Sequence, residues 1–151
     1  MTEKLRWFEP SDTEQVMSLY AGEDQWFEKI GVTRDFILIS SQRLDFRFLV
    51  AEEEGKIVGF TGCLYFEAVG RAEIGPLEVD AEHRRKGVGE ALIKGMTEFL
   101  KEKKIRRVAA KVKADNRAAQ QFFIKQGFRI ESCLRDYTQE HESIIGLVTF
   151  I

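Results

Sequence analysis

The feature that constrains this sequence most is a basic glycine turn that joins an extended segment to an amphipathic helix. Arg84, Arg85 and Lys86 stand directly before Gly87-Val88-Gly89. Beyond the turn, apolar residues recur at helical spacing through Leu100, with charged residues between them. The unpaired N–H groups and partial positive charge of a helix N-terminus attract anions, and the three basic side chains strengthen that attraction. The pattern therefore predicts a local site for a phosphate or pyrophosphate group.

The turn differs from the two best-known phosphate-binding motifs. It lacks the GxxxxGK(S/T) pattern of a nucleoside-triphosphate loop, and the segment from Gly87 to Leu92 lacks the third glycine of a dinucleotide fingerprint. Because glycine has no Cβ, Gly87 and Gly89 still let the backbone turn tightly and approach a ligand closely. Taken alone, such a turn is also typical of a solvated connection. As an anion site, it favours neither ATP nor NAD.

Length and charge exclude several classes of protein. The chain has 151 residues, which fits one domain over residues 1–151. It carries 23 Lys and Arg against 25 Asp and Glu, so its net charge of -2 predicts no binding to nucleic acid or to a membrane. Cys63 and Cys133 stand singly, which indicates neither a metal site nor a disulfide. No apolar run is long enough to span a bilayer, and a cytoplasmic location is predicted.

Strand-like alternation of apolar residues occurs at intervals along the chain. Extended segments are predicted at residues 4–8 and from Asp45 to about Phe66, with a hairpin turn at Glu54-Gly55-Lys56. Another is predicted at about 71–80, where Pro76 indicates a bulge or an edge position. Further strands are expected at 108–112, 128–135 and 143–151.

Helical spacing separates these strands. A helix capped by Ser11 or Asp12 is predicted to run towards Tyr20, and a second lies somewhere in 24–42. The helix after Gly87 is followed by a short one over 118–123, which ends before Gly127. The fold class is therefore α/β or α+β, built around a central sheet.

Two segments resemble the conserved blocks of the GNAT N-acetyltransferase family. The first, LEVDAEHRRKGVGEAL from Leu77 to Leu92, is similar to the family's signature strand, its (R/Q)xxGx(G/A) loop and its helix. The second, from Asp115 to Phe128, is similar to the block in which an Asn, here Asn116, opens a helix that closes in Gly-Phe. The match covers about a third of the chain, and the rest follows the family only in its order of elements. It implies a mixed, mostly antiparallel sheet of about six to seven strands flanked by about four helices.

The resemblance also implies a co-substrate, acetyl-coenzyme A (acetyl-CoA), and residues that contact it. The backbone of the turn from Arg84 to Gly89 would wrap the pyrophosphate, and the strand at Leu77 to Val79 would pair with the pantetheine arm. Asn116 would lie beside the thioester. A backbone N–H near Val79, freed from its strand by the bulge, would donate to the thioester oxygen.

Two glutamates are candidates for the general base that removes the proton of the amine. The resemblance favours Glu73, which stands eleven residues before Arg84, the spacing of a catalytic glutamate in histone-acetylating members of the family. Glu78 is the alternative. Alternation along a strand sends Glu73 and Glu78 to opposite faces unless a bulge intervenes. Replacing Glu73 with Gln is expected to lower the rate without weakening co-substrate binding. Each residue also fits an ordinary surface position.

The chain departs from the family at the position of the general acid. Where many members have a tyrosine, seven residues after Asn116, this sequence has Phe123, which also fits a core position on its helix. A thiol with a pKa of about 8.5 can leave as the thiolate without a proton donor, so the departure need not abolish activity. Tyr65 and Tyr137 are other possible donors, but lone tyrosines usually serve packing.

The amine acceptor is the part of the function on which the sequence says least. Polyamines, aminoglycosides, lysine, protein N-termini, amino acids and small amines all remain open. A cation would be drawn in by acidic residues, of which the chain has five near the expected entrance: Glu23, Asp24, Glu28, Glu140 and Glu142.

Two other functions remain open besides acetyl transfer. One is a catalytically silent acyl-CoA sensor of the same fold, and the other is a phosphate-ester or nucleotide-binding domain that leaves residues 115–128 unexplained. A homodimer is also plausible from the family, with the hydrophobic C-terminal strand as a possible contact.

Overall fold

The computed structural model describes residues 3–21 and 32–151 of the chain. One seven-stranded sheet has the order β1-β2-β3-β4-β5-β7-β6. Its strands are β1 Lys4–Trp7, β2 Phe46–Glu53, β3 Lys56–Phe66, β4 Arg71–Val79, β5 Arg107–Lys113, β6 Arg129–Leu134 and β7 Ile144–Phe150. The α-helices of the described residues are α1 Thr13–Ala21, α2 Arg34–Ser41, α3 Val88–Glu102 and α4 Arg117–Lys125. Neighbouring strands are antiparallel except β4 and β5, which are parallel, so the expected mixed sheet is confirmed.

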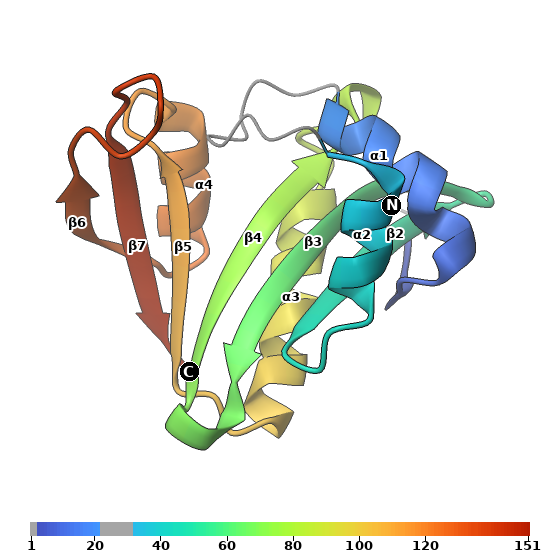
Figure 1. Ribbon diagram of the computed structural model, residues 1–151, viewed down its shortest axis with the longest axis horizontal. Coiled ribbons are helices and arrows are strands. Elements are labelled where there is room, and N and C mark those ends of the chain that lie inside the picture. The colour runs from blue at the N-terminus through green and yellow to red at the C-terminus, as the bar shows by residue number, and fades with distance from the viewer. Residues whose placement is uncertain (1–2, 22–31) are drawn as a thin grey trace.

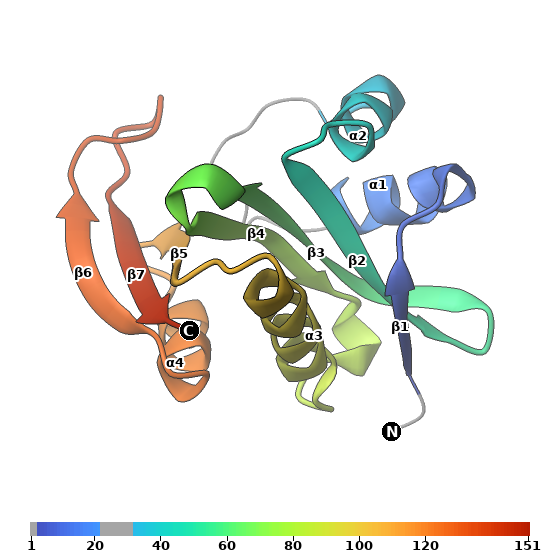
Figure 2. The ribbon, with the colours of Figure 1, turned by 90° about the horizontal axis from the view of Figure 1, so that it is seen from below.

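The helices cover both faces of the sheet. Helices α1 and α2 lie on one face, and α3 and α4 lie on the other (Figure 2). Each face has its own buried cluster: α3 packs with Ile74 and Val108, whereas α1 and α2 pack with Val50 and Phe60. Burial of these apolar side chains on both faces supplies the main favourable free energy of folding.

The hairpin between β2 and β3 follows directly from its turn residues. Glu54 and Gly55 both have positive φ, at 52° and 79°, which matches the right-handed twist of the two strands. Helix α4 ends as expected before Gly127, whose φ is 95°. These local predictions are therefore confirmed.

The first helical segment begins differently from the prediction. Residues Pro10–Asp12 form a 3₁₀ helix whose N-cap is Glu9, and α1 begins only at Thr13. Pro10 fixes its own φ and starts the helical turn earlier than a Ser11 or Asp12 cap implies. Asp12 accepts the backbone N–H of Glu9 instead, at 2.8 Å. The second predicted helix, within 24–42, is α2; the part of that range from 24 to 31 lies outside the described residues.

Strand β4 separates from β5 halfway along its length. The two strands pair from Arg71 with Arg107 to Ile74 with Ala110 and then diverge towards their carboxyl ends (Figure 1). At the same point Gly75 and Pro76 stand together opposite Gly62 of β3, so the bulge expected at Pro76 is confirmed. A Cβ on Gly62 would lie 2.8 Å from the Gly75 carbonyl oxygen, which shows how closely the bulge approaches β3.

The outer strands correct the expected dimer contact. β7 pairs with β5 on one side and with β6 on the other, so its edge is not available to a second copy of the chain. The edge strands of the sheet are β1 and β6. Dimerisation itself stays a prediction.

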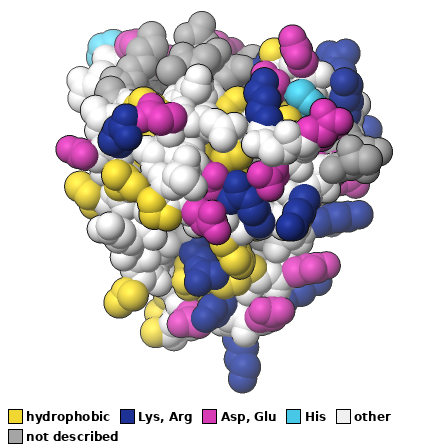
Figure 3. Space-filling model, turned by 90° about the vertical axis from the view of Figure 1, so that its right-hand side faces the viewer, with side chains coloured by type: hydrophobic (Ala, Val, Ile, Leu, Met, Phe, Trp, Pro, Cys, Tyr) yellow, Lys and Arg dark blue, Asp and Glu magenta, His cyan; other side chains and the backbone are white. Residues whose placement is uncertain are grey.

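The outer surface carries charges of both signs. On the face shown in Figure 3, basic and acidic side chains are interspersed rather than separated into one-signed regions. None of the helices over residues 3–21 and 32–151 combines the length and the apolar composition needed to cross a membrane.

Candidate active site

The gap between β4 and β5 is occupied by a cleft of about 1180 Å³. Residues of α1, α2, the carboxyl half of β4, the turn before α3 and α4 along most of its length line it. It reaches both faces of the sheet, because it passes the point at which the sheet splits. The cleft thus joins the predicted phosphate turn to the predicted bases.

The phosphate turn lies at one end of the cleft. Arg84, Arg85, Gly87 and Gly89 line it, whereas Val88 is buried in the core beneath it. Gly87 has a φ of 90° and is the N-cap of α3, whose first N–H groups receive no side-chain cap. These N–H groups and the adjoining basic side chains are the donors that an anion at a helix N-terminus needs.

Lys86 differs from its neighbours in the turn. It is exposed and does not line the cleft. Arg84 has a structural contact as well, because its Nε donates to the carbonyl oxygen of Val79 at 3.2 Å. This hydrogen bond ties the turn to the end of β4 and keeps both at the same end of the cleft.

The free half of β4, from Gly75 to Val79, is the part that does not pair with β5, and it turns backbone groups into the gap. The N–H of Asp80 donates to Val58 O at 2.8 Å, so the peptide groups of Asp80 and Glu78 point to β3. By alternation those of Leu77 and Val79 point the opposite way, into the space that β5 has left. A ligand with its own amide groups can pair with this edge as a further strand does.

The bulge brings Glu73 and Glu78 to the same face of the sheet. Opposite them on β3 stand Leu64 and Phe60, and both glutamates line the cleft. Without the extra residue, strand alternation separates positions 73 and 78. The sequence did not determine whether Glu73 and Glu78 face the same side, and the register of β4 against β3 shows that they do.

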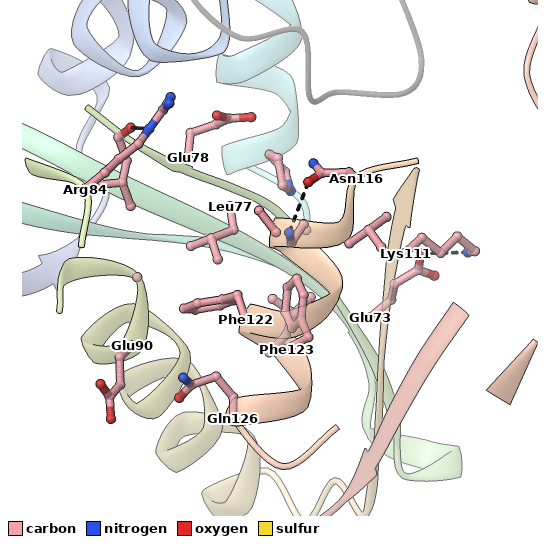
Figure 4. A pocket seen from close by; sticks show the side chains of 18 of the residues that line it. Glu73, Leu77, Glu78, Arg84, Glu90, Lys111, Asn116, Phe122, Phe123 and Gln126 are labelled. Carbon is pink, nitrogen blue, oxygen red and sulfur yellow. Dashed lines mark hydrogen bonds and ion pairs between the residues drawn. The ribbon is translucent and has the colours of Figure 1, made fainter. Parts of the chain in front are cut away.

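The environments of the two glutamates differ. Glu73 is half exposed, and Lys111 Nζ donates to its Oε1 at 2.7 Å (Figure 4). Glu78 is only 4% exposed and stands opposite Phe60, on the face of the sheet that α1 and α2 cover. Burial raises the pKa of Glu78 to about 8. Glu78 therefore exchanges a proton near neutral pH, as a general base does.

Helix α4 supplies the opposite wall. Asn116 lines the cleft, but its Oδ1 already accepts the N–H of Ala119 at 3.0 Å and caps the helix. Phe123 is 6% exposed and packs edge-on against Phe128, as its core interpretation predicts, and it also lines the cleft, so its predicted contact with the co-substrate stays a prediction. Phe122 packs next to Gly89, where an added Cβ would lie 3.3 Å from its ring.

Other predicted polar residues lie elsewhere. Tyr65 is buried against Phe99, away from the cleft. Glu142 is bound to Lys113 at 3.3 Å, and neither it nor Glu140 lines the cleft. The acidic residues Glu23, Asp24 and Glu28 lie outside the described residues.

Several residues that line the cleft carry no motif in the sequence. Tyr20, Phe36, Phe46 and Phe48 reach it from α1, α2 and β2, and Lys111 reaches it from β5. Burial and the nearby carboxylate of Glu78 raise the pKa of Tyr20. In the sequence these rings are indistinguishable from core residues, because apolar spacing alone does not distinguish a core position from a cleft wall.

Comparison with known proteins agrees with this geometry. The model of the acetyltransferase (GNAT) family matches residues 5–128. An uncharacterised N-acetyltransferase of Methanocaldococcus jannaschii is 30% identical over 124 residues, which cover 78% of this chain and 55% of that protein. The chain thus spans about half the length of this curated relative.

Solved structures share the whole fold. Ard1 from Thermoplasma volcanium is 26% identical, with a TM-score of 0.88 over 100% of this chain and 99% of that chain. The protein yncA of Salmonella typhimurium, solved with its cofactor acetyl-CoA, has a TM-score of 0.84 at 16% identity, over 99% of this chain and 94% of that chain. With a family model that matches residues 5–128 and the mixed, mostly antiparallel sheet that the resemblance implied, the chain belongs to the GNAT acetyltransferase family.

Proposed function

We propose that the chain binds acetyl-CoA and transfers its acetyl group to a primary amine by direct attack in a ternary complex. The observation that carries the proposal is the free half of β4. It offers outward N–H groups at Leu77 and Val79, ends beside the uncapped N-terminus of α3, and bears the buried Glu78. An anion site, a strand-like edge and a base with a pKa near neutrality thus lie in one cleft.

The residues present fit acetyl-CoA as co-substrate. The pyrophosphate suits the N-terminus of α3 with Arg84 and Arg85, and the open space at Gly87 admits a close approach, because an added Cβ there would meet nothing within 4 Å. The amide groups of the pantetheine arm suit the edge at Leu77 and Val79. The ring of Phe122 beside Gly89 offers an apolar wall to the same arm.

The reaction needs one proton removed and one oxygen stabilised. The amine nitrogen attacks the thioester carbonyl carbon, a C–N bond forms, the C–S bond breaks, and the amine proton passes to a base. Glu78 accepts that proton, because its carboxylate faces the cleft and its pKa of about 8 lets it take and release a proton near neutrality. The outward N–H of Leu77 or Val79 stabilises the negative charge that develops on the carbonyl oxygen.

Glu78 is a better candidate than Glu73 for this role. The carboxylate of Glu73 is engaged by Lys111, whose Nζ donates to Oε1 at 2.7 Å, so an amine nitrogen would have to compete with that ion pair. We assign Glu73 and Lys111 a structural role in the wall of the cleft, at the point where β4 and β5 separate. The thiolate of coenzyme A leaves without a donor at Phe123, as its ordinary pKa of about 8.5 permits.

The test combines binding with turnover. Thermal unfolding is measured with acetyl-CoA, coenzyme A, ATP and NAD, and thiol release is then followed with a panel of amines. A ligand at 100 times its Kd adds about 2.7 kcal/mol to the free energy of unfolding. We expect stabilisation by acetyl-CoA and coenzyme A alone, followed by amine-dependent thiol release. Stabilisation without release for any amine would favour the silent sensor instead, and no stabilisation would reject the proposal.

A further inference from the structure

The cleft has a second end, on the face of the sheet covered by α1 and α2. Glu73 and Glu78 face this side, whereas the N-terminus of α3 lies on the other (Figure 2). If acetyl-CoA occupies the α3 end, as the proposed function requires, the amine must enter from the α1 and α2 side. The side chains at that end therefore contact the acceptor and select it.

Aromatic rings form most of this end. Phe46 and Phe48 meet edge-on with centroids 4.7 Å apart, and Phe48 meets Phe60 in the same way at 5.8 Å. Tyr20 continues the row against Phe60 at 5.1 Å. Phe36 of α2 also lines the cleft and remains 40% exposed. Phe48, Phe60 and Tyr20 are themselves buried, so the apolar surface that an acceptor can cover belongs to Phe36 and Phe46, at about 25 cal/mol per Å² buried.

The charges at this end are mostly engaged. Arg43 gives both Nε and Nη2 to the carboxylate of Asp45, at 2.8 and 3.0 Å. Lys111 is bound to Glu73. Among the described residues that line this end, Glu78 is therefore the carboxylate left to meet an amine nitrogen. A second or third ammonium group on the same acceptor would meet rings and the Lys111–Glu73 pair there, with no further carboxylate outside an ion pair among the described residues that line this end.

We infer that the acceptor is a primary amine with a single positive charge, carried within a few bonds of one large apolar group. The nitrogen reaches Glu78, and the apolar group lies against Phe46, which Phe48 supports from behind, with Phe36 closing the mouth. An arylalkylamine and the N-terminal residue of a peptide with a large apolar side chain share this chemistry. Polyamines and aminoglycosides do not.

The test is a matched panel of acceptors at saturating acetyl-CoA. Phenethylamine and a Phe-led tripeptide amide represent the two sources of the apolar amine, ethylamine represents the amine alone, and spermidine represents the polycation. We expect kcat/KM for at least one of the two aromatic acceptors to exceed that for ethylamine and spermidine by tenfold or more, about 1.4 kcal/mol. The better of the two aromatic acceptors identifies the source.

Two variants of α2 make the test specific. Phe36→Ala removes a half-exposed ring that lines the cleft, so the fold is retained, and we expect kcat/KM for the aromatic acceptor to fall about tenfold while that for ethylamine changes less than about twofold. Ile39→Ala removes an exposed apolar side chain of the same helix that does not line the cleft. It should leave both acceptors unchanged.

The results that would overturn this inference alone differ from those that would also reject the proposed function. Preference for spermidine, or an equal loss for every acceptor in Phe36→Ala, would overturn this inference while leaving acetyl transfer intact. An absence of turnover with every amine, despite acetyl-CoA binding, would reject the proposed function and this inference with it.

Discussion

The two halves of β4 show how one inserted residue changes the use of a strand. From Arg71 to Ile74 the strand is paired on both sides, and Glu73 forms an ordinary ion pair with Lys111. From Gly75 to Val79 it is paired on one side only, and Glu78 is buried. The first half joins β3 to β5 within the sheet, and the second presents its outward peptide groups and Glu78 to the cleft.

The bulge produces both differences at once. By inserting a residue opposite Gly62 it reverses the faces of the following side chains, which turns Glu78 to the same face as Glu73. Because β5 diverges there, the outward peptide groups lose their partner strand as well. This open edge is where the proposed acetyl-CoA would take the place of the missing strand. The predictions below test whether the two halves differ in function as they do in structure.

The largest expected effect is on kcat, and it should differ between substitutions of Glu78 and of Glu73. Glu78→Gln keeps the shape of the side chain but cannot accept a proton, so we expect kcat to fall by about 10²- to 10³-fold, the usual contribution of a general base. Glu73→Gln should lower kcat less than about tenfold. Steady-state kinetics with one amine at saturating acetyl-CoA measures both. Equal losses would remove the functional difference between the halves.

The pH profile supplies the control for this pair. In the unmodified chain, the part of kcat/KM that depends on Glu78, measured as the ratio to Glu78→Gln, should rise with pH and level off above about 8, where Glu78 is ionised. The acceptor amine titrates equally in every variant, so a limb that disappears only in Glu78→Gln belongs to Glu78. Retention of that limb in Glu78→Gln, or its loss in Glu73→Gln, would assign the base elsewhere.

The second prediction concerns stability against pH. The pKa of Glu78 is about 8 in the folded chain and about 4.3 when unfolded, so between these values the folded state holds a proton that the unfolded state releases. The free energy of unfolding should therefore fall with rising pH from 5 to 8, by roughly 1 kcal/mol per pH unit from this group, and level off above 8.

Urea unfolding at several pH values checks this, with Glu78→Gln as the reference. Other groups titrate alike in both proteins, so the difference in their free energies of unfolding isolates Glu78. Parallel curves for the two proteins would show that Glu78 is not buried as a neutral acid.

A third, smaller effect concerns the support of the bulge. Thr61 is fully buried, and its Oγ1 donates to the carbonyl oxygen of Pro76 at 2.9 Å. Thr61→Val leaves that oxygen unsatisfied, which should cost about 1–3 kcal/mol of stability and lower kcat by displacing the edge at Leu77. Thr61→Ser keeps the hydroxyl and should retain kcat. A Val variant as active as the Ser variant would show that the bulge holds without this hydrogen bond.

The sequence predicted the half of the molecule that is built from local signals. The turn from Arg84 to Gly89, the hairpin at Glu54 and the helix end at Gly127 each depend on glycines or charges within a few residues, and all three were located correctly. Pro76 predicted the bulge in the same way, because a proline has no N–H to donate to a neighbouring strand. The seven-stranded sheet followed from these pieces and the family resemblance.

The acceptor half was not predictable in this way. Whether Glu73 and Glu78 share a face depends on the register between β3 and β4, which no local pattern specifies. The rings of Phe36 and Phe46 look like core residues in the sequence and line the cleft only because α2 and β2 meet there. Pairing across the sheet, as between Lys111 and Glu73, likewise appears only once the strands are placed.

The smallest expected effect concerns the paired half of β4. Glu73 and Lys111 are 40% and 27% exposed, so water screens their attraction, and forming the pair removes little water from either charge. A double-mutant cycle with Glu73→Gln and Lys111→Met, measured by urea unfolding, should give a coupling free energy below about 1 kcal/mol, smaller still in 1 M salt. A coupling of several kcal/mol that persists in salt would mean that this pair, rather than the backbone pairing with β5, holds the sheet together at the point of division. The chemical difference between the two halves would then begin two residues before the bulge, at Glu73.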